Sequence, residues 1–219
     1  MCGRFLINAL PTEIAEVFRV PEEPSLFPEP RYNIAPGQPV PVVVQVDGTR
    51  ALRVMKWGLI PSWAKDPSIG FRTINARADS VADKPTFRAA FRKRHCLVPA
   101  SGFYEWKAVG KKKMPTLFRP ASGLFGFAGL WETWPGDGEP LDTFTIITTD
   151  ANTTVTPTHN RMPVIIDPAD YGTWLDAASS TDGGLLRPYR PEAMTATPIG
   201  TYVNDAKHQG PECVEPVVA

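Results

Sequence analysis

The chain has 219 residues, of which 42% are hydrophobic, so it is long enough to bury a core and fold alone. Its 23 basic and 23 acidic residues give a formal charge of zero, so any binding of nucleic acid must come from a local cluster of cations. The three cysteines, Cys2, Cys96 and Cys213, fit neither a disulfide framework nor a C-x-x-C metal motif, which indicates a reducing cytoplasm.

Signals for a leader, a membrane span or a bound group are absent from the sequence. The first ten residues hold no apolar run long enough for a signal peptide, and no later stretch approaches the roughly 18 apolar residues of a membrane span. A Walker loop, a dinucleotide fingerprint, a G-x-S-x-G motif and a zinc-ligand spacing are all missing. We therefore expect a cytoplasmic monomer without membrane contact, metal or cofactor.

The first 60 residues predict one helix and a hairpin. Thr12 can cap a helix that carries Ile14, Val17 and Phe18 at helical spacing and ends by Pro21. Prolines make residues 24–37 an extended loop. Residues 40–46 and 51–57 are then predicted to form a hairpin around an Asp-Gly turn at 47–48.

The rest of the chain predicts mainly strands. We expect an extended segment or strand at residues 71–77, and a basic helix around Phe87, Ala90 and Phe91. Further strands are predicted at 96–99, 103–108, 115–119, 124–131 and 144–149, and a last short helix at 168–177, with Pro168 near its start. Because no repeat or linker divides the chain, we predict one α+β domain over residues 1–219. Its core would be a curled, mostly antiparallel, barrel-like sheet flanked by short helices.

Cys2 carries the most informative chemistry. Removal of Met1, which is usual before a small residue, leaves a cysteine whose α-amine and thiol lie on adjacent carbons. Their unperturbed pKa values are about 7.7–8.0 and about 8.5, so both have a reactive fraction near neutral pH. Such a pair condenses with an aldehyde to an imine, and the thiol then closes a thiazolidine ring. The alternative is that Cys2 is a small buried hydrophobe that happens to begin the chain.

Two other side chains are suited to moving protons. His159 lies in a polar turn before the apolar segment 164–166, where it can shuttle protons at neutral pH unless it is only solvated or bonded to the backbone. Glu105 lies between aromatic residues of a predicted strand, where desolvation would raise its pKa and make it a proton donor. Strand alternation leaves open that Glu105 faces solvent instead.

Asn75 and Arg77 share a face of the segment at 71–77, which suits an amide that orients a carbonyl group and a guanidinium that grips a phosphate. Arg4 is tethered two residues from Cys2. Trp57 and Trp63 could stack on bases, although Trp57 fits core packing better. The basic residues at 88–95 and 111–113 indicate a solvated helix face and a turn.

Six short sequence blocks, each present once, are distributed along the chain. They are Met-Cys-Gly-Arg-Phe at 1–5, Arg-Tyr-Asn-Ile-Ala-Pro at 31–36, Trp-Gly-Leu-Ile-Pro at 57–61, Asn-Ala-Arg-Ala at 75–78, Gly-Phe-Tyr-Glu-Trp at 102–106 and His-Asn-Arg-Met-Pro at 159–163. Together they resemble the SRAP family, whose name stands for SOS response-associated peptidase. With the tail motif Asn-Asp-Ala-Lys at 204–207, the resemblance covers nearly the whole chain.

The resemblance implies a sensor of abasic sites in single-stranded DNA that shields the damage through a thiazolidine crosslink to Cys2. By matching positions, Cys2 is the nucleophile, Asn75 orients the adduct, and Glu105 and His159 transfer protons. The matching DNA-binding positions are Arg4, Pro36, Trp63, Arg77 and Arg161. Some relatives have a second Trp where this chain has Ala64.

Several activities stay open at this point. The resemblance does not decide whether the chain removes its own Met1 as a peptidase, or whether it also cleaves the DNA strand as an AP lyase. One rival interpretation is an N-terminal-cysteine amidohydrolase or peptidase, which would turn over and regain its mass. Another is a non-covalent RNA- or DNA-binding module, for which Cys2→Ala would leave binding intact.

Overall fold

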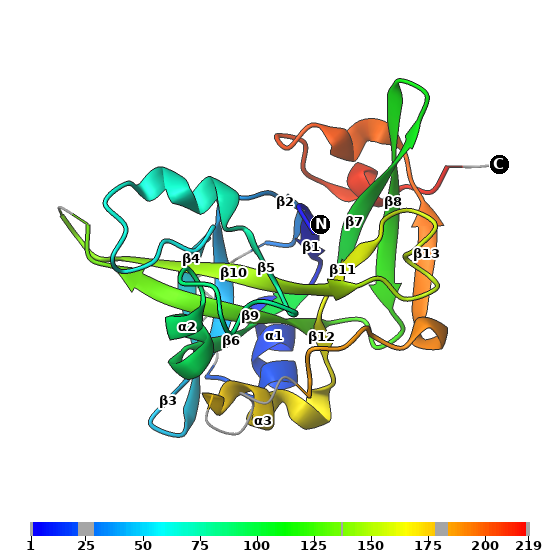
Figure 1. Ribbon diagram of the computed structural model, residues 1–219. Helices are drawn as coiled ribbons and strands as arrows, with labels where there is room; N and C mark the ends of the chain where they lie inside the picture. Colours follow the sequence, from blue (N-terminus) through cyan, green and yellow to red (C-terminus); the bar gives the residue numbers. More distant parts are fainter. Residues whose placement is uncertain (1, 22–28, 137, 178–183, 218–219) are drawn as a thin grey trace.

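The computed structural model describes residues 2–21, 29–136, 138–177 and 184–217, and more of this part of the chain is in strands than in helices (Figure 1). In chain order the strands are β1 (Phe5–Ile7), β2 (Arg31–Ile34), β3 (Pro39–Val46), β4 (Thr49–Trp57), β5 (Asn75–Arg77), β6 (His95–Ala100), β7 (Gly102–Val109), β8 (Lys112–Pro120), β9 (Phe125–Trp134), β10 (Leu141–Asp150), β11 (Arg161–Pro163), β12 (Ile165–Ile166) and β13 (Met194–Pro198).

Helices are short and lie between the strands. The α-helices are α1 (Pro11–Phe18), α2 (Arg88–Lys93) and α3 (Tyr171–Leu175). Short 3₁₀-helices occur at η1 (Pro67–Arg72), η2 (Pro168–Asp170), η3 (Pro191–Ala193), η4 (Thr201–Asn204) and η5 (Pro211–Val214).

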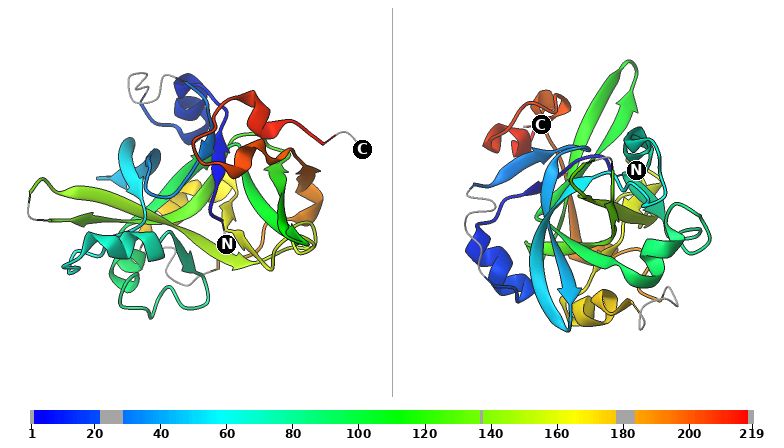
Figure 2. Two further views of the ribbon diagram at one scale, coloured as in Figure 1. Left: turned by 90° about the horizontal axis from the view of Figure 1, so that it is seen from above. Right: turned by 90° about the vertical axis from the view of Figure 1, so that its left-hand side faces the viewer.

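Two sheets organise the fold. The smaller sheet has the order β13-β8-β7-β1-β2, and the larger has the order β11-β10-β4-β3-β6-β9-β12, with β5 beside β10. β9 also pairs with β10, so the larger sheet curls back on itself, as both views of Figure 2 show. Only the pairings of β10 with β4 and β5 are parallel among the described strands. This confirms the predicted α+β fold with a curled, mostly antiparallel, barrel-like sheet.

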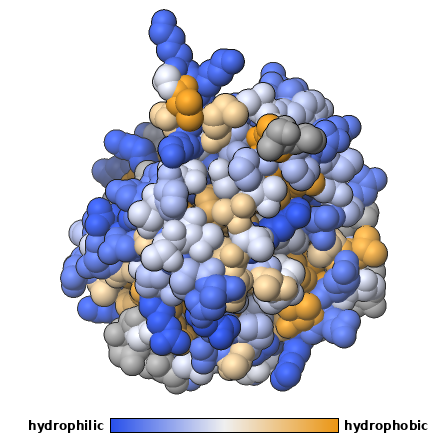
Figure 3. Space-filling model, turned by 90° about the vertical axis from the view of Figure 1, so that its right-hand side faces the viewer, coloured by the Kyte–Doolittle hydropathy of each residue, from blue (hydrophilic) through white to orange (hydrophobic). Residues whose placement is uncertain are grey.

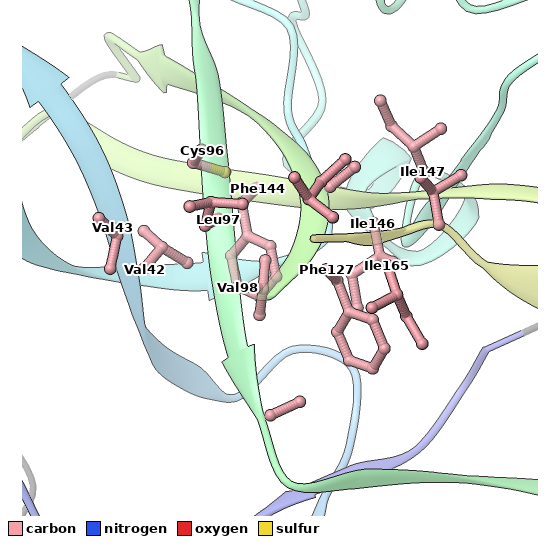
Figure 4. Close-up of a cluster of buried hydrophobic side chains, with 14 of the residues drawn as sticks. Val42, Val43, Cys96, Leu97, Val98, Phe127, Phe144, Ile146, Ile147 and Ile165 are labelled. Carbon is pink, nitrogen blue, oxygen red and sulfur yellow. The ribbon is translucent and has the colours of Figure 1, made fainter. Parts of the chain in front are cut away.

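The main core fills the inside of the larger sheet. Val42, Val98, Phe127 and Phe144 come from four different strands and are fully buried in the cluster drawn in Figure 4. Neighbouring residues on a strand face opposite sides of a sheet, yet Val42, Val43 and Val44 are all fully buried, so both faces of β3 are covered. Truncating one of these phenylalanines to alanine typically costs about 3–5 kcal/mol of stability.

A smaller cluster lies under the other sheet and the C-terminal turns. It contains Leu6, Tyr104, Leu117, Ile199, Val203 and Cys213, all buried. Because β7 lies between this cluster and the main core, residues on both of its faces are buried: Phe103 packs in the main core and Tyr104 in the smaller cluster.

Several predicted elements occur where we expected them. The hairpin of β3 and β4 turns at Asp47 and Gly48, both with positive φ. Trp57 is buried in the core, and its Nε1–H donates to the carbonyl of Ile74. The helix at α2 and the short helix after Pro168 are also present.

Other predictions need correction. The first helix is capped at Leu10, because Pro11 fixes the first helical φ and Glu13 accepts from the Leu10 N–H at 2.7 Å, so Thr12 is not the cap. Part of the predicted loop, residues 31–34, is the strand β2, since it pairs with β1. The N-terminal side of that loop, residues 22–28, lies outside the described residues.

The segment at 71–77 is a strand only from Asn75. Before it, the Asp66 side chain caps η1 by accepting from Ser68 N–H at 2.8 Å, which keeps the chain helical through Arg72. A close approach fixes this region: Gly58 has φ +125°, and a Cβ there would lie 2.5 Å from the carbonyl oxygen of Gly70. Only glycine fits at position 58.

Candidate active site

A cavity of about 550 Å³ opens beside the start of the chain. Its lining comes from the segment before β1, from β7 and β8, from the turn before β11 and from η4. The lining residues are Gly3, Arg4, Glu105, Trp106, Ala108, Lys113, His159 and Asn204. The structure therefore brings together three residues singled out from the sequence, Arg4, Glu105 and His159.

Cys2 lies next to this cavity and is fully buried. The pairing of β1 with β7, with Phe5 opposite Phe103, brings the residues before β1 alongside Glu105. The Arg4 carbonyl accepts from Tyr104 N–H at 3.0 Å, which extends this contact toward Cys2. Burial, and then the nearby negative charge of Glu105, raise the pKa of the Cys2 thiol far above its usual range. The thiol is therefore protonated at neutral pH unless a base takes its proton.

Glu105 is only 3% exposed, so the alternative of a solvent-facing strand residue is wrong. The reason is the position of β7 between two clusters, which buries both of its faces. Burial raises the pKa of the Glu105 carboxyl to about 7. A carboxyl group with this pKa exists in both protonation states near neutral pH, so it can give or take a proton.

His159 is partly buried and held by the backbone of its own turn. Its Nδ1 accepts a hydrogen bond of 3.0 Å from the N–H of Arg161. Burial lowers the pKa of His159, which favours the neutral ring. Nδ1 also lies 3.2 Å from the carbonyl oxygen of Arg161, but the backbone N–H can only donate and is the closer of the two, so we assign Nδ1 as the acceptor and the proton of the neutral ring to Nε2. His159 therefore presents an N–H donor to its surroundings.

Asn75 does not line the cavity. It lies on β5, where its Nδ2 donates to the carbonyl of Ile74 at 3.0 Å. Its Oδ1 is buried and accepts no hydrogen bond within the described part of the chain. A buried oxygen without a partner is costly, and strain, a catalytic role or a bound water or ion accounts for such atoms in native proteins.

Arg77 and Arg161 are close to each other but already paired. Arg77 is exposed at the end of β5 and donates to Asp79. Arg161 is buried on β11, donates to the carbonyl of Thr148 at 2.6 Å and pairs with Asp150 at 3.1 Å. Both arginines lie on strands that pair with β10; their predicted role in binding phosphate stays a prediction.

Arg4 is bound by the fold itself. Its Nη1 donates to Oδ1 of Asn33 at 2.8 Å and to the carbonyl of Val203 at 3.1 Å, and its guanidinium lies 5.8 Å from the centre of the Trp106 ring. Trp106 in turn donates to Oδ1 of Asn204 at 2.7 Å. These contacts connect the cavity wall to the C-terminal turns.

Pro36 and Trp63, the other predicted DNA-binding residues, lie outside the cavity. Pro36 is in the turn that follows β2, and Trp63 is 60% exposed in the loop after β4. The carbonyl of Ala64 accepts from Nε1–H of Trp134 at 2.7 Å, which anchors this loop beside its exposed tryptophan.

Our sequence reasoning missed Trp106, Lys113 and Asn204 as cavity residues. Trp106 directly follows Glu105, so its position in the same block was a usable signal. Lys113 lies opposite Ala108 in the hairpin of β7 and β8, and this register was not visible in the sequence. The tip of that hairpin stands out from the body of the protein and is largely hydrophilic (Figure 3).

Within the described ranges, no group of three or more His, Cys, Asp or Glu side chains is placed to hold a metal ion. No helix in those ranges is long and apolar enough to cross a membrane.

The fold and the cavity together define an α+β protein whose candidate active site is built around the start of its own chain. The chain belongs to the SRAP family, SOS response associated peptidase, whose model matches residues 1–206.

Relatives and solved structures agree with this assignment. The chain is 39% identical to the abasic site processing protein YoqW of Bacillus subtilis, over 98% of this chain and 99% of the relative. It is 36% identical to the abasic site processing protein HMCES of Gallus gallus, over 86% of this chain and 66% of the relative. A crystal structure of a Bacteroides thetaiotaomicron protein superposes with a TM-score of 0.89, at 27% identity, over 99% of this chain and 100% of the other.

Proposed function

We propose that this protein processes abasic sites in DNA, and that it does so by forming a covalent thiazolidine link from Cys2 to the ring-opened sugar in single-stranded DNA. The observation that carries this proposal is the position of Glu105. Its buried carboxyl group has a pKa raised to about 7 and lies in the cavity that begins beside Cys2. The names of the relatives YoqW and HMCES support the same substrate.

The reaction begins with removal of Met1, which frees the α-amine of Cys2. An abasic sugar is mostly a closed hemiacetal, so an acid must protonate the ring oxygen to expose the aldehyde, and protonated Glu105 is placed for this step. The amine then attacks the aldehyde carbon, and loss of one water gives an imine. The thiol sulfur adds to the imine carbon while its proton passes to the nitrogen, which closes the ring.

The raised pKa of the Cys2 thiol makes a base necessary for the last step. After Glu105 has given its proton to the sugar, its carboxylate can take the proton of the thiol and pass it to the imine nitrogen as the ring closes. The same group returns protons in the reverse direction, so one carboxyl group serves both opening and closing. A lysine imine has no second nucleophile and hydrolyses, whereas the thiazolidine should last.

The surrounding residues then have separate roles. The unpartnered Oδ1 of Asn75 orients the sugar or the adduct, and Nε2–H of His159 donates to a developing oxygen charge. Arg77 and Arg161 contact the phosphates that flank the lesion, and Trp63 stacks on a base. Strand cleavage as an AP lyase and removal of Met1 by the chain itself are further activities that the same site could support.

The test uses a single-stranded oligonucleotide with one abasic site. Wild-type protein should give a band on a denaturing gel whose intact mass equals protein plus DNA minus one water, and Cys2→Ala should give none. An undamaged oligonucleotide of the same sequence is the control. If wild-type protein gives no shifted band, the covalent mechanism is wrong. If the protein forms no lasting band but turns over an amide substrate and regains its original mass, an amidohydrolase mechanism replaces it.

A further inference from the structure

The two arginines beside β10 are held by two carboxylates of the same chain. Arg77 donates to Asp79 from Nε at 3.2 Å and also from Nη2. Arg161 Nη1 lies 3.1 Å from Asp150 and 3.9 Å from Asp79. Asp79 thus contacts both guanidinium groups. Two positive and two negative charges cancel in this cluster, so it offers little net attraction to a phosphate.

Strand pairing explains why the four groups meet. Arg77 lies opposite Thr148 in the parallel pair of β5 and β10, and Arg161 lies opposite Asp150 in the antiparallel pair of β10 and β11. The two arginines therefore come from the strands on either side of β10, which lie next to it in Figure 1. Asp79 follows Arg77 by two residues and reaches across toward Arg161.

The four side chains differ in how free they are to move. The side chains of Asp79 and Asp150 are 52% and 87% exposed, so both carboxylates can turn into solvent. The side chain of Arg161 is only 10% exposed and is fixed by its bond to Thr148. The hydrogen bond from Arg77 lowers the pKa of Asp79, so Asp79 is ionised at neutral pH. A phosphate that approaches the arginines must therefore displace a charged and mobile competitor.

We propose that Asp79 sets the selectivity of the site by competing with DNA phosphates for Arg77 and Arg161. This proposal rests on the proposed function and deepens it. An undamaged strand gains too little from the arginines to stay bound, because it must first displace Asp79. A strand with an abasic site faces the same cost but is retained by the bond to Cys2. Asp79 thereby keeps the protein from occupying intact single-stranded DNA.

The test measures equilibrium binding of an undamaged single-stranded oligonucleotide by fluorescence anisotropy at several salt concentrations. Asp79→Asn should bind about three- to tenfold more tightly than wild type, since the ion pair that phosphate must displace is at the surface and therefore weak but measurable. Its plot of log K against log salt should be steeper by about 0.7, the amount expected for one more neutralised phosphate. Asp83→Asn, an equal charge change at an exposed residue outside the cluster, is the matched control.

Two outcomes would overturn the proposal. If Asp79→Asn binds undamaged DNA as wild type does, Asp79 does not compete. If it binds more weakly with a shallower salt slope, Asp79 instead holds Arg77 in the orientation that phosphate needs. Asp150→Asn, which removes the other carboxylate, should give a gain of the same sign and keeps the test available if Asp79→Asn folds poorly.

The failure of this proposal is separable from failure of the covalent mechanism. The anisotropy experiment contains no abasic site, and the gel experiment reads only the covalent bond. Normal crosslinking by wild type together with unchanged binding by Asp79→Asn would remove the role of Asp79 alone. Tighter binding by Asp79→Asn without any crosslinking by wild type would remove the covalent mechanism and keep the competing carboxylate.

Discussion

The backbone N–H of Arg161 donates to Nδ1 of His159 at 3.0 Å, and this contact decides which proton the imidazole carries. Nδ1 acts as the acceptor, so a neutral ring has its hydrogen on Nε2. Burial lowers the pKa of His159, so the neutral form dominates at neutral pH. Another N–H donor can replace His159 if its role is to donate a hydrogen bond, but not if its role is to act as a general base.

His159→Gln should therefore retain most of the crosslinking rate, because the glutamine amide also offers an N–H donor. His159→Ala should lose about 10²-fold, the usual cost of removing one such donor. The measurement is the rate of adduct formation with abasic single-stranded DNA on denaturing gels, with Asn160→Ala as a control at an exposed neighbour. If glutamine is as slow as alanine, His159 moves a proton instead of donating a fixed hydrogen bond.

Glu105 should make the stability of the fold depend on pH. Its pKa is about 7 in the folded protein and about 4.3 in the unfolded chain, so the folded state holds the proton more tightly. The contribution of protonated Glu105 to the stability of the fold is complete below about pH 4 and is lost as the pH rises through 7. The free energy of unfolding of Glu105→Gln minus that of wild type should therefore rise by as much as roughly 3 kcal/mol between pH 4 and pH 8. Urea denaturation at both pH values measures this difference, and a difference that does not change with pH would contradict the buried acid.

The same substitution should slow the chemistry in both directions. Glu105→Gln leaves Cys2 intact, so the adduct should still form, but without the group that moves protons. Formation should be slower, and release of the adduct to excess competing abasic DNA should be slower as well, by about 10²-fold or more. Time courses on denaturing gels measure both rates. Normal rates in both directions would assign Glu105 a structural role.

Asn33 should be essential for the wall of the cavity. It is fully buried, and its Nδ2 donates to the carbonyls of Val203, Asp205 and His208 at 2.8–3.2 Å. Asn33→Ala removes four side-chain hydrogen bonds, and although Arg4 keeps its bond to Val203, the carbonyls of Asp205 and His208 lose this buried donor, so the change should cost about 2–4 kcal/mol of stability. Urea denaturation against Asn160→Ala as the control checks this value. A loss below about 0.5 kcal/mol would show that the C-terminal turns are held by other contacts.

Local signals in the sequence were enough for the elements that depend on neighbouring residues. The hairpin of β3 and β4 follows from its Asp-Gly turn at 47–48, and α2 follows from its apolar spacing. Residues 67–72 became a helical turn because of the cap at Asp66, which competes with the strand pattern that begins at Phe71. β1 and β13 are short, and β7 and β8, with which they pair, lie far away in the chain, so the sequence pattern did not reveal them.

In the candidate site, too, residue types could be recognised from the sequence, whereas contacts between distant residues could not. The chemistry of Cys2 and the block around Glu105 could be recognised from residue types, but the surroundings of Glu105 depend on the start of the chain, which β1 brings alongside β7, and on the distant turn that holds His159. Similarly, the contacts of Arg4 with Asn33 and Val203 required the folded chain, and they show that its guanidinium is bound within the protein. The carboxylates beside Arg77 and Arg161 were visible as letters but not as ion pairs.

The most direct test of the covalent mechanism is whether it needs a free amine on Cys2. Protein from which Met1 has been removed and protein that keeps a residue before Cys2 are each confirmed by intact mass, then mixed with abasic single-stranded DNA and separated on a denaturing gel. The ring requires amine and thiol on one residue, so only the processed protein should give a lasting band, and Cys2→Ser should give at most a reducible imine. Equal crosslinking by the blocked protein would contradict the thiazolidine mechanism.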